Sequence, residues 1–360
     1  MRTQNLLTTS VALGLLAFAP ACFVVDDAAL KEARNNAADG GADGGSTVAA
    51  ADQCGDPATP ALKNSEAMQS ARVDTTSLSM FPTNLQPSCA GVGGTPGNDG
   101  FLRLDVQAGQ YFHFHVQPIT AGRDPVVYML QSNCDVTSCA GLTLANRCGV
   151  GQDEHFGFRF TNGGTWYLGV DDKVTGGGEY LVGAFRPMCG NGVKEHGEGC
   201  DNADPNPPMG QVCDDQCRVV ISGTTVSEVE INDDIYWANH VSFGAEPLPT
   251  TVPPVTVNGT LLGTCDPDAY TIRLASARIF TVTQLPPSGV TCPASNANVT
   301  LRVTLASGVD AQGMVTTAAN GCLQYTSTTA LPTGQYFVQM TYDGTPMDTT
   351  VPYKLQMAIQ

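Results

Sequence analysis

The chain has 360 residues, of which 42% are hydrophobic and 14% are charged, whereas roughly 25% are charged in an average soluble protein. Its 39 glycines and 23 prolines favour many short strands joined by turns, which excludes a helical bundle and a coiled coil. The 34 acidic residues outnumber the 17 basic ones and give a formal net charge of −17. This charge excludes a nucleic-acid binder, because such proteins need basic patches.

The N-terminus has the pattern of an export signal. Arg2 provides a positive charge, and residues 6–18 form a mostly apolar stretch that is too short to span a bilayer well. We therefore expect residues 1–21 to be a signal peptide. The sequence Ala-Pro-Ala-Cys that ends at Cys22 resembles the lipobox of bacterial lipoproteins, and this resemblance implies that Cys22 becomes the lipid-carrying first residue of the mature chain. Plain secretion, with cleavage at a neighbouring alanine, is the alternative.

Residues 22–52 are rich in Ala, Gly and Asp. The run AADGGADGGSTVAAAD within them cannot bury enough apolar surface to fold. We expect a flexible tether, which a random-coil chain of this length would extend over about 30 Å. A lipid anchor followed by such a tether would hold the folded part of the protein away from the membrane.

Residues 53–187 and 226–360 share a pattern of short strands with alternating apolar residues. The pattern occurs in FLRLDVQAGQYFHFHV from Phe101 and returns in YTIRLASARIFTVTQL from Tyr270. GTWYLGVDD from Gly164 matches GQYFVQMTYDG from Gly334 at near-equal spacing, which indicates an internal duplication. We therefore predict an all-β protein with two antiparallel β-sandwiches, joined by a small disulfide-stapled cysteine-rich repeat.

This strand pattern resembles that of bacterial pre-peptidase C-terminal domains. The second half also carries the opening signature of that family, in SEVEINDDIYWAN from Ser227 to Asn239. The first half lacks the Glu-x-Asn-Asp opening and begins with CGDPATP at Cys54. The resemblance implies accessory β-sandwich modules of exported enzymes or surface proteins, and no catalytic domain accompanies them in this sequence.

Residues 188–220, which we call the clip, lie between the two halves. The sequence CGNGVKEHGEGCDNADPNPPMGQVCDDQC from Cys189 to Cys217 resembles the Myxococcus cysteine-rich repeat of myxobacterial exported proteins. A segment of fewer than about 40 residues with few apolar side chains needs covalent or metal staples. We expect disulfides, because the export signal implies an oxidising compartment. A zinc site is the alternative, although the spacing lacks paired Cys-x-x-Cys ligands.

The chain has 13 cysteines, and an odd number in an exported protein requires an explanation. Lipidation of Cys22 would leave 12, an even number. If the four cysteines of the clip pair with one another, one further bridge must join the two sandwiches, because the first half has five cysteines and the second has three. The sequence does not give the connectivity. The expected disulfide cysteines are Cys54, Cys89, Cys134, Cys139, Cys148, Cys189, Cys200, Cys213, Cys217, Cys265, Cys292 and Cys322.

Oxygen-bearing side chains gather where the second half opens, and calcium takes six to eight oxygen ligands. The segment EVEIND resembles the calcium-binding linker in collagen-binding domains of clostridial collagenases, and that resemblance implies two further Asp ligands from a later strand. The alternative is that the Asn and Asp of this segment only cap the turn that follows. The candidate ligands are Glu228, Glu230, Asn232, Asp233, Asp266 and Asp268. A second acidic cluster, a calcium candidate or merely solvated charge, lies in the clip: Glu195, Glu198, Asp201, Asp204, Asp214 and Asp215.

Other candidates for chemistry are weaker. His113 and His115, with His155, are a metal candidate, but the intervening phenylalanines point inward, so we expect this pair of histidines to face solvent. Trp166 and Trp237 are candidates for stacking on sugar rings. The sequence contains no His-Glu-x-x-His, no Gly-x-Ser-x-Gly elbow and no phosphate-binding glycine loop. We therefore predict that the protein is not an enzyme.

These features together predict an exported, non-catalytic protein, either a lipoprotein at the outer membrane or cell surface or a secreted protein. We expect it to bind or adhere to an envelope polymer or a protein. The alternatives are an accessory or inhibitory subunit of a secreted hydrolase and a structural envelope spacer. We expect no nucleic-acid partner, membrane contact only through a lipid anchor, and no required cofactor, with Ca²⁺ as the candidate ion.

Overall fold

The computed structural model describes residues 47–48, 54–57, 59–62, 68–78, 97–132, 144–145, 148–194, 197–207, 211–230, 232–245, 248–249, 251–286, 292, 298–344 and 349–360. Within these residues the protein is all-β, as predicted, and has no α-helix. No helix in this part of the chain is long and apolar enough to cross a membrane. Contacts divide the chain into Met1–Gly45 and Ser46–Gln360, and every strand lies in the second of these units.

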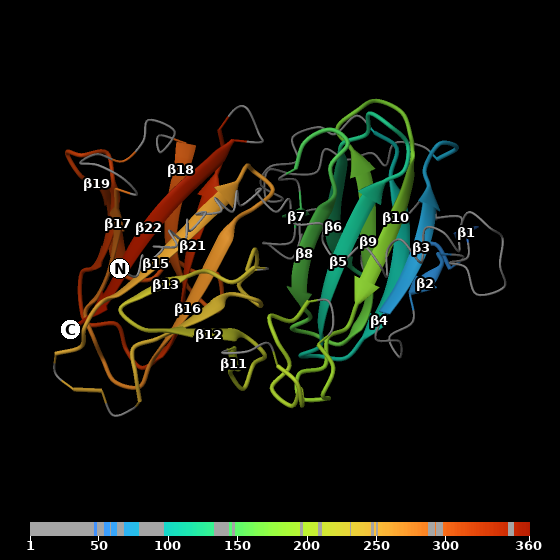
Figure 1. Ribbon diagram of the computed structural model, residues 1–360. Helices are drawn as coiled ribbons and strands as arrows, with labels where there is room; N and C mark the ends of the chain where they lie inside the picture. The colour runs from blue at the N-terminus through green and yellow to red at the C-terminus, as the bar shows by residue number, and fades with distance from the viewer. Residues whose placement is uncertain are drawn as a thin grey trace, which may run out of the picture. The chain divides into compact units, whose positions relative to one another are not determined.

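Two five-stranded sheets form the first sandwich (Figure 1). Sheet A has the order β1 (Thr47–Val48), β3 (Met68–Asp74), β10 (Glu179–Phe185), β5 (Tyr111–Pro118) and β8 (Glu154–Arg159). Sheet B has the order β2 (Ala61–Leu62), β4 (Gly100–Val106), β9 (Gly164–Asp172), β6 (Pro125–Gln131) and β7 (Leu144–Ala145).

Two six-stranded sheets form the second sandwich. Sheet C has the order β11 (Val212–Cys213), β12 (Val219–Ser222), β14 (Asn239–Ser242), β16 (Asp268–Leu274), β21 (Gly334–Tyr342) and β18 (Val299–Leu305). Sheet D has the order β13 (Thr225–Ser227), β15 (Val255–Leu262), β22 (Thr350–Ile359), β17 (Phe280–Leu285), β20 (Leu323–Ser327) and β19 (Gly313–Thr317).

The strand orders of the two sandwiches correspond. In sheets B and C, β4-β9-β6 matches β16-β21-β18, and in sheets A and D, β3-β10-β5-β8 matches β15-β22-β17-β20. The opening strands also match, because β1 pairs parallel to β3 as β13 pairs parallel to β15. Among the described strands, β11, β12 and β19 have no counterpart in the first sandwich. The two sandwiches therefore share one central arrangement and differ at their edges, since β7 of the first sandwich also has no counterpart among the described strands of the second.

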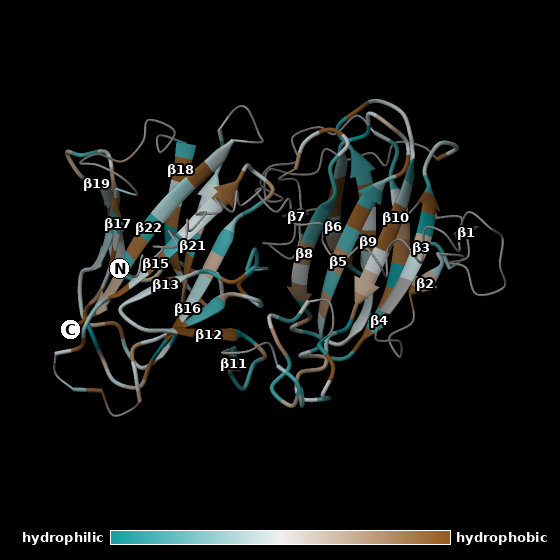
Figure 2. Cartoon of the chain, viewed as in Figure 1, coloured by the Kyte–Doolittle hydropathy of each residue, from teal (hydrophilic) through white to brown (hydrophobic). Residues whose placement is uncertain are grey.

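Each sandwich encloses its own core, built from the apolar positions that alternate in the sequence. Phe112 and Phe114 of β5 are fully buried in the first core, and Phe280 and Val282 of β17 are fully buried in the second. Figure 2 shows hydrophobic and hydrophilic segments alternating along strands such as β5. Burial of each such side chain contributes about 1.5–3 kcal/mol relative to leaving it exposed.

The structure extends the first sandwich into the segment that we expected to be a flexible tether. Thr47 and Val48 form β1, whose partners in β3 are Arg72 and Val73. Both residues are β-branched, which favours an extended strand, and the neighbouring β3 offers an edge with which they pair. The low apolar content of the surrounding residues hid this short pairing. The rest of residues 22–52, and the predicted signal peptide 1–21, lie outside the described residues.

The second sandwich packs directly on the outer face of sheet A. The ring of Trp237 meets the ring of His113 edge-on, with 4.0 Å between the ring centroids. The ring of Tyr236 lies 4.6 Å from that of Tyr111. The backbone N–H of Gly157 donates to the Asp234 carboxylate at 3.0 Å. The two sandwiches are thus in contact through side chains as well as being joined by the clip.

Two of our sequence-based expectations were wrong. His113 and His115, which we expected to face solvent, are 1% and 6% exposed; Trp237 of the second sandwich lies against His113, and Asp153 lies 3.1 Å from His115. Trp166, in the core of the first sandwich, and Trp237 are also buried, so neither presents a ring on which a sugar would stack.

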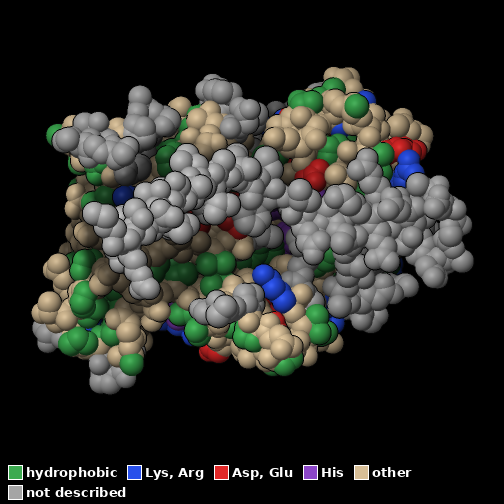
Figure 3. All heavy atoms as spheres, viewed as in Figure 1, with side chains coloured by type: hydrophobic (Ala, Val, Ile, Leu, Met, Phe, Trp, Pro, Cys, Tyr) green, Lys and Arg blue, Asp and Glu red, His purple; other side chains and the backbone are tan. Residues whose placement is uncertain are grey.

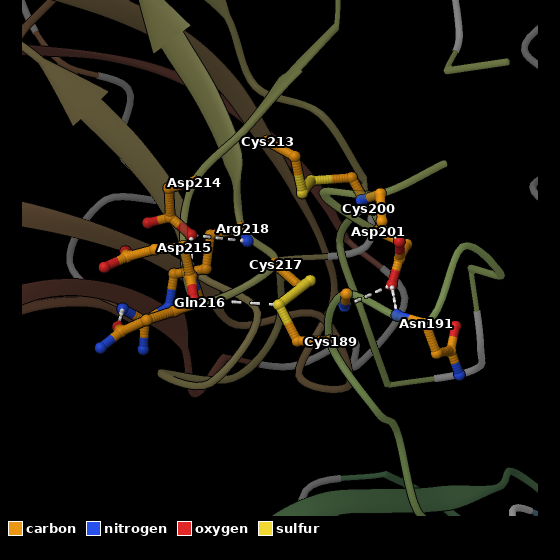
Figure 4. The surroundings of a disulfide bond; sticks show 12 residues. Cys189, Asn191, Cys200, Asp201, Cys213, Asp214, Asp215, Gln216, Cys217 and Arg218 are labelled. Atoms are coloured by element: carbon orange, nitrogen blue, oxygen red, sulfur yellow. Dashed lines mark hydrogen bonds between the residues drawn. A yellow bond between two sulfur atoms is a disulfide. The ribbon is translucent and has the colours of Figure 1, made fainter. Parts of the chain in front are cut away.

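The clip is held by two disulfides, Cys189–Cys217 and Cys200–Cys213 (Figure 4). Between them the Asp201 carboxylate accepts four backbone N–H groups, including those of Gly190 and Gly192. Both glycines have positive φ angles, near 88°, which aim their N–H groups at the carboxylate. Burial raises the pKa of Asp201, but these donors outweigh burial and leave the pKa below its usual value.

The acidic residues of the clip therefore have structural roles. Asp214 accepts the backbone N–H groups of Gln216 and Arg218 and forms an ion pair with Arg273 of β16. Arg218 in turn donates to two backbone carbonyls in residues 235–236, so the clip also holds the segment that packs on sheet A. Glu198, Asp201 and the Cys217 sulfur do place ligand atoms within 4.8 Å of one another, but this sulfur is bonded to Cys189 and Asp201 already accepts four N–H groups. Glu195 of the same predicted cluster lies outside the described residues.

A third disulfide, Cys148–Cys265, joins the two sandwiches, and a fourth, Cys292–Cys322, lies within the second. Cys54 is also disulfide-bonded. Cys22, Cys89, Cys134 and Cys139 lie outside the described residues. Disulfides persist in oxidising compartments and are rare in the cytosol of most organisms, so the protein is extracytoplasmic.

We expect the bridge between the sandwiches to contribute most to stability. It closes a chain separation of 117 residues, whereas Cys200–Cys213 closes 13. By loop-closure entropy the double variant Cys148→Ser/Cys265→Ser should lose about 5 kcal/mol of unfolding free energy, against about 3 kcal/mol for Cys200→Ser/Cys213→Ser. Urea unfolding of the two variants beside the parent protein measures both losses, and equal losses would contradict the expectation.

Candidate metal centre

The candidate ligands begin in the segment that follows β13. The buried side chain of Asn239 fixes this segment, because its amide accepts the N–H of Val229 at 2.7 Å and donates to the carbonyl of Val229 at 2.9 Å. Three residues further on, the carbonyl of Asn232 accepts the N–H of Ala269 in β16 at 2.8 Å. Residues 228–230, 232 and 233 are thereby held against the beginning of β16.

Carboxylates from this segment and from the start of β16 converge into two groups. Glu228, Glu230 and Asp268 form one group, and Glu230, Asp233 and Asp266 form the other; in each, the ligand oxygens lie within 4.8 Å of one another. Two oxygens on opposite sides of a calcium ion lie about 4.6–5.2 Å apart. The spacing within each group is therefore that of oxygens around one cation, and Glu230 belongs to both groups.

The side-chain amide of Asn232 lies against these carboxylates. Its NH2 group donates to Glu230 Oε2 at 2.9 Å and to Asp268 Oδ1 at 3.0 Å. The Asn232 side chain is fully buried, so it holds Glu230 and Asp268 together inside the protein.

Two buried tyrosines complete the inner side of the cluster. The hydroxyl of Tyr270 donates to Glu228 Oε2 at 2.8 Å, and the hydroxyl of Tyr353 lies 3.0 Å from the same oxygen and 2.6 Å from Asp268 Oδ2. Gly259 makes room for this arrangement, because a Cβ atom there would overlap both the Tyr353 ring and Glu228 Oε2. The backbone N–H of Thr260 donates to the other oxygen of Glu228, Oε1, at 2.6 Å, so the tyrosines and this N–H together orient the carboxylates of Glu228 and Asp268.

Burial is the main cause that raises the pKa values of Glu228, Glu230, Asp266 and Asp268. Burial, followed by the charges of Asp266 and other neighbouring carboxylates, raises the pKa of Glu230 to about 9. Burial and the charge of Asp233 raise the pKa of Asp266 to about 7. Among the described residues no Lys or Arg forms an ion pair with any carboxyl group of the cluster. These buried groups therefore need protons or a bound cation to balance their charge.

The cluster lies where the second sandwich meets the first. Nε2 of His155, on β8, lies 2.8 Å from Asp233 Oδ2. Asp266 directly follows Cys265, which is bonded to Cys148 of the first sandwich. The candidate centre therefore has a covalent link and a hydrogen bond to the first sandwich.

The structure brings together all six residues that the sequence nominated as calcium ligands: Glu228, Glu230, Asn232, Asp233, Asp266 and Asp268. Sequence reasoning missed the two tyrosines and His155. Tyr270 and Tyr353 occupy inward positions of their strands. A hydroxyl-bearing residue at an inward position in both strands could have indicated a buried polar partner. Nothing in the local sequence of His155 marks it as a neighbour of residue 233.

No protein-family model and no curated protein matches this chain. Among solved structures it is similar to Aeromonas hydrophila PliG, a periplasmic lysozyme inhibitor of g-type lysozyme, at 21% identity and a TM-score of 0.23, over 39% of this chain and 99% of that one. It is similar to the pre-peptidase C-terminal domain of collagenase from Bacillus anthracis at 20% identity and a TM-score of 0.20, over 30% and 89% of the two chains. The human MASP-1/3 CUB1-EGF-CUB2 domain shows 9% identity and a TM-score of 0.18, over 82% and 100%. At such low TM-scores these likenesses carry no argument about function.

Without bound metal, the stability of the protein should fall as pH rises. An acid whose pKa is raised by folding favours the folded state only while it is protonated, so its contribution is complete below the unfolded-state pKa and disappears through the folded one. For Asp266 this window runs from 3.8 to about 7, and for Glu230 from 4.5 to about 9. We expect the melting temperature in chelator to decrease from pH 5 to pH 9.

The variant Glu230→Gln provides the control, because it removes the charge that both groups share. Its melting temperature in chelator should decrease less over the same pH range. A parent protein that becomes more stable from pH 5 to pH 9 in chelator would show that these carboxyl groups do not have raised pKa values.

Proposed function

We propose that this protein is a non-catalytic, extracytoplasmic binding protein, in which calcium holds the two sandwiches as one binding unit. The observation that carries the proposal is the convergence of five carboxyl groups at the junction of the sandwiches, without Lys or Arg ion pairs among the described residues. Calcium bound there would neutralise the carboxylates and link residues 228–233 to the beginning of β16. It would thereby fix the segment that packs on sheet A.

The non-catalytic part of the proposal is supported by the use of the histidines. His113 packs between aromatic rings, and His115, His155 and His240 each lie against an aspartate. These contacts hold the two sandwiches and the clip in place. The acid and base groups of the junction are therefore engaged in structure, which favours binding over catalysis.

Calcium binding can be tested by melting the protein with Ca²⁺ and with chelator. Calcium at one hundred times its dissociation constant should add about 2.7 kcal/mol of unfolding free energy. Glu230→Gln should lose most of this gain because Glu230 belongs to both ligand groups. Asp310→Asn, which changes an exposed acid paired with Arg302 in the same sandwich, should keep it.

Two outcomes would contradict calcium binding. One is an unchanged melting temperature of the parent protein on adding Ca²⁺ at pH 7. The other is an equal gain in the parent and in Glu230→Gln, since the calcium would then bind elsewhere. Limited proteolysis between residues 228 and 239 gives a second measurement, because calcium should slow cleavage of this segment in the parent protein only.

The net charge of −17 favours a cationic partner. Such a partner is either a basic polymer of the envelope or a basic protein. Charged side chains are sparse on the described part of the face in Figure 3, so the attraction would arise from the whole charge distribution and not from one dense patch. A basic secreted hydrolase fits the same charge argument, and an accessory or inhibitory role towards such an enzyme is our second candidate function.

A pull-down with envelope polymers and secreted proteins, followed by a salt titration, should separate these functions. Binding to a cationic partner should weaken steeply between 50 and 500 mM NaCl as screening increases. A captured hydrolase whose activity changes on binding would favour the second candidate. Capture only of neutral or acidic partners, with no dependence on salt, would contradict the charge argument, and no capture at all would favour a structural spacer.

We further propose that Cys22 carries a lipid that anchors the protein at the outer membrane or cell surface, with residues 22–46 as a tether. The Ala-Pro-Ala-Cys sequence and the odd number of cysteines support this proposal. Mass spectrometry of the mature N-terminus should find an acylated Cys22 as the first residue. An unmodified thiol at position 22, or cleavage elsewhere, would contradict it.

A further inference from the structure

One sheet edge of the second sandwich ends in a strand that the first sandwich lacks. β19 lies outside β20 in sheet D, and no strand follows it in the sheet order (Figure 1). In sheet A, the strand that corresponds to β20 is β8, and its outer edge is covered in part because Gly157 donates its N–H to Asp234. β19 is thus an added edge strand. Among the described strands, none pairs with its outer edge.

The register shows which backbone groups of β19 face outward. At the two ends of the strand, Thr328 donates to the carbonyl of Gln312 and Ala318 donates to the carbonyl of Cys322. Hydrogen-bonded pairs alternate along an antiparallel ladder, so residues 314 and 316 direct their backbone groups at β20. Residues 313, 315 and 317 direct theirs away from the sheet.

The side chains of this edge are open to solvent and apolar at its centre. All five residues of β19 are exposed, and Met314 and Val315 are 63% and 41% exposed. Natural sheets protect such edges with charges, prolines or bulges. β19 has no charged residue and no proline, so the usual protection against strand addition is missing.

The neutrality extends well beyond the strand. No residue from Ala311 to Tyr342 is charged, in a chain whose net charge is −17. The charged residue that precedes this stretch, Asp310, forms an ion pair with Arg302. Two copies of so acidic a chain repel each other over most of their surfaces. At the edge formed by β19, which has no charged residue, two copies can approach without bringing like charges together.

The edge is also fixed in place before any contact. The disulfide Cys292–Cys322 holds the turn between β19 and β20, and the N–H of Cys292 donates to the carbonyl of Asn320 in that turn. A fixed strand loses little conformational freedom when another strand pairs with it.

From these observations we propose that a second copy of this chain adds its β19 antiparallel to the β19 of the first, with Val315 at the centre. In this register Val315 pairs with Val315 of the second copy, and Gly313 pairs with Thr317 in both directions. Each of these pairs exchanges two backbone hydrogen bonds. The two D sheets then form one continuous sheet, with Val315 beside its copy and Met314 diagonal to its copy.

Sedimentation equilibrium of the calcium-loaded protein at 1–200 μM tests the pairing. The weight-average mass should rise towards twice the monomer mass. Val315→Lys should weaken dimerisation at least tenfold, because two ammonium groups would lie side by side. Val315→Pro should do the same by removing an outward N–H that has no partner within its own sheet. Thr326→Lys, which adds the same charge one strand further in, is the matched control and should dimerise as the parent does.

Crosslinking tests the register. The Cα atoms of a hydrogen-bonded pair lie about 5.5 Å apart, within the range of a disulfide, so Val315→Cys should form a covalent dimer under mild oxidation. Thr317→Cys should not, because residue 317 pairs with residue 313, about 13 Å along the strand from its own copy. Dimerisation should also strengthen as NaCl rises from 20 to 150 mM, since salt screens the repulsion between the two acidic chains.

Three results would overturn the proposal. A parent protein that is monomeric up to 200 μM would leave the edge to a segment of a different protein. A dimer that persists in both Val315→Lys and Val315→Pro would place the interface elsewhere. Equal crosslinking of the two cysteine variants would exclude the antiparallel register centred on residue 315. Circular dichroism of each variant shows whether its sheets are intact.

Discussion

The buried carboxylates at the junction of the two sandwiches are the constraint on which the rest of the structure depends. Asp268 and Asn232 are fully buried, and four further carboxyl groups lie beside them. Ionised groups removed from water need a partner of opposite charge or a proton. Several other features hold this cluster in place: the hydrogen bonds between the Asn239 amide and the backbone of Val229, the hydroxyls of Tyr270 and Tyr353, and the space left by Gly259. Glu228, Glu230 and Asp233 of the cluster and the side chains that contact sheet A belong to one segment that ends at Asn239, so a change in this segment affects both.

The alternation of apolar residues was sufficient to predict the fold, because each sandwich buries the inward face of its central strands. Phe112, Phe114, Phe280 and Val282 are buried as their spacing requires. The duplication was also visible, since matched strands occupy matched positions in both sandwiches. A short strand such as β1 was not, because two β-branched residues in a glycine-rich run carry too weak a pattern, and only the neighbouring edge of β3 makes them a strand.

The candidate site was predicted in its ligands but not in its setting. Carboxylates spaced along one segment indicate a cation site from local sequence alone. His113 of β5 shows why the setting was missed: its alternation with phenylalanines is typical of a solvated face, whereas Trp237 of the other sandwich packs against it. Contacts between distant segments have no local signal. The glycines of the clip are similar, since their roles at Asp201 follow from φ angles that the sequence does not display.

The bridge between Cys148 and Cys265 has a consequence for biogenesis. The chain is synthesised from its N-terminus, so during vectorial translocation the first sandwich emerges more than a hundred residues before its sulfur partner. Cys189, Cys200, Cys213 and Cys217 emerge in that interval. The thiol at Cys148 must therefore stay reduced, or be released from a mixed pairing, while the clip oxidises around it. Correct maturation then requires an isomerase or shielding of that thiol until Cys265 emerges.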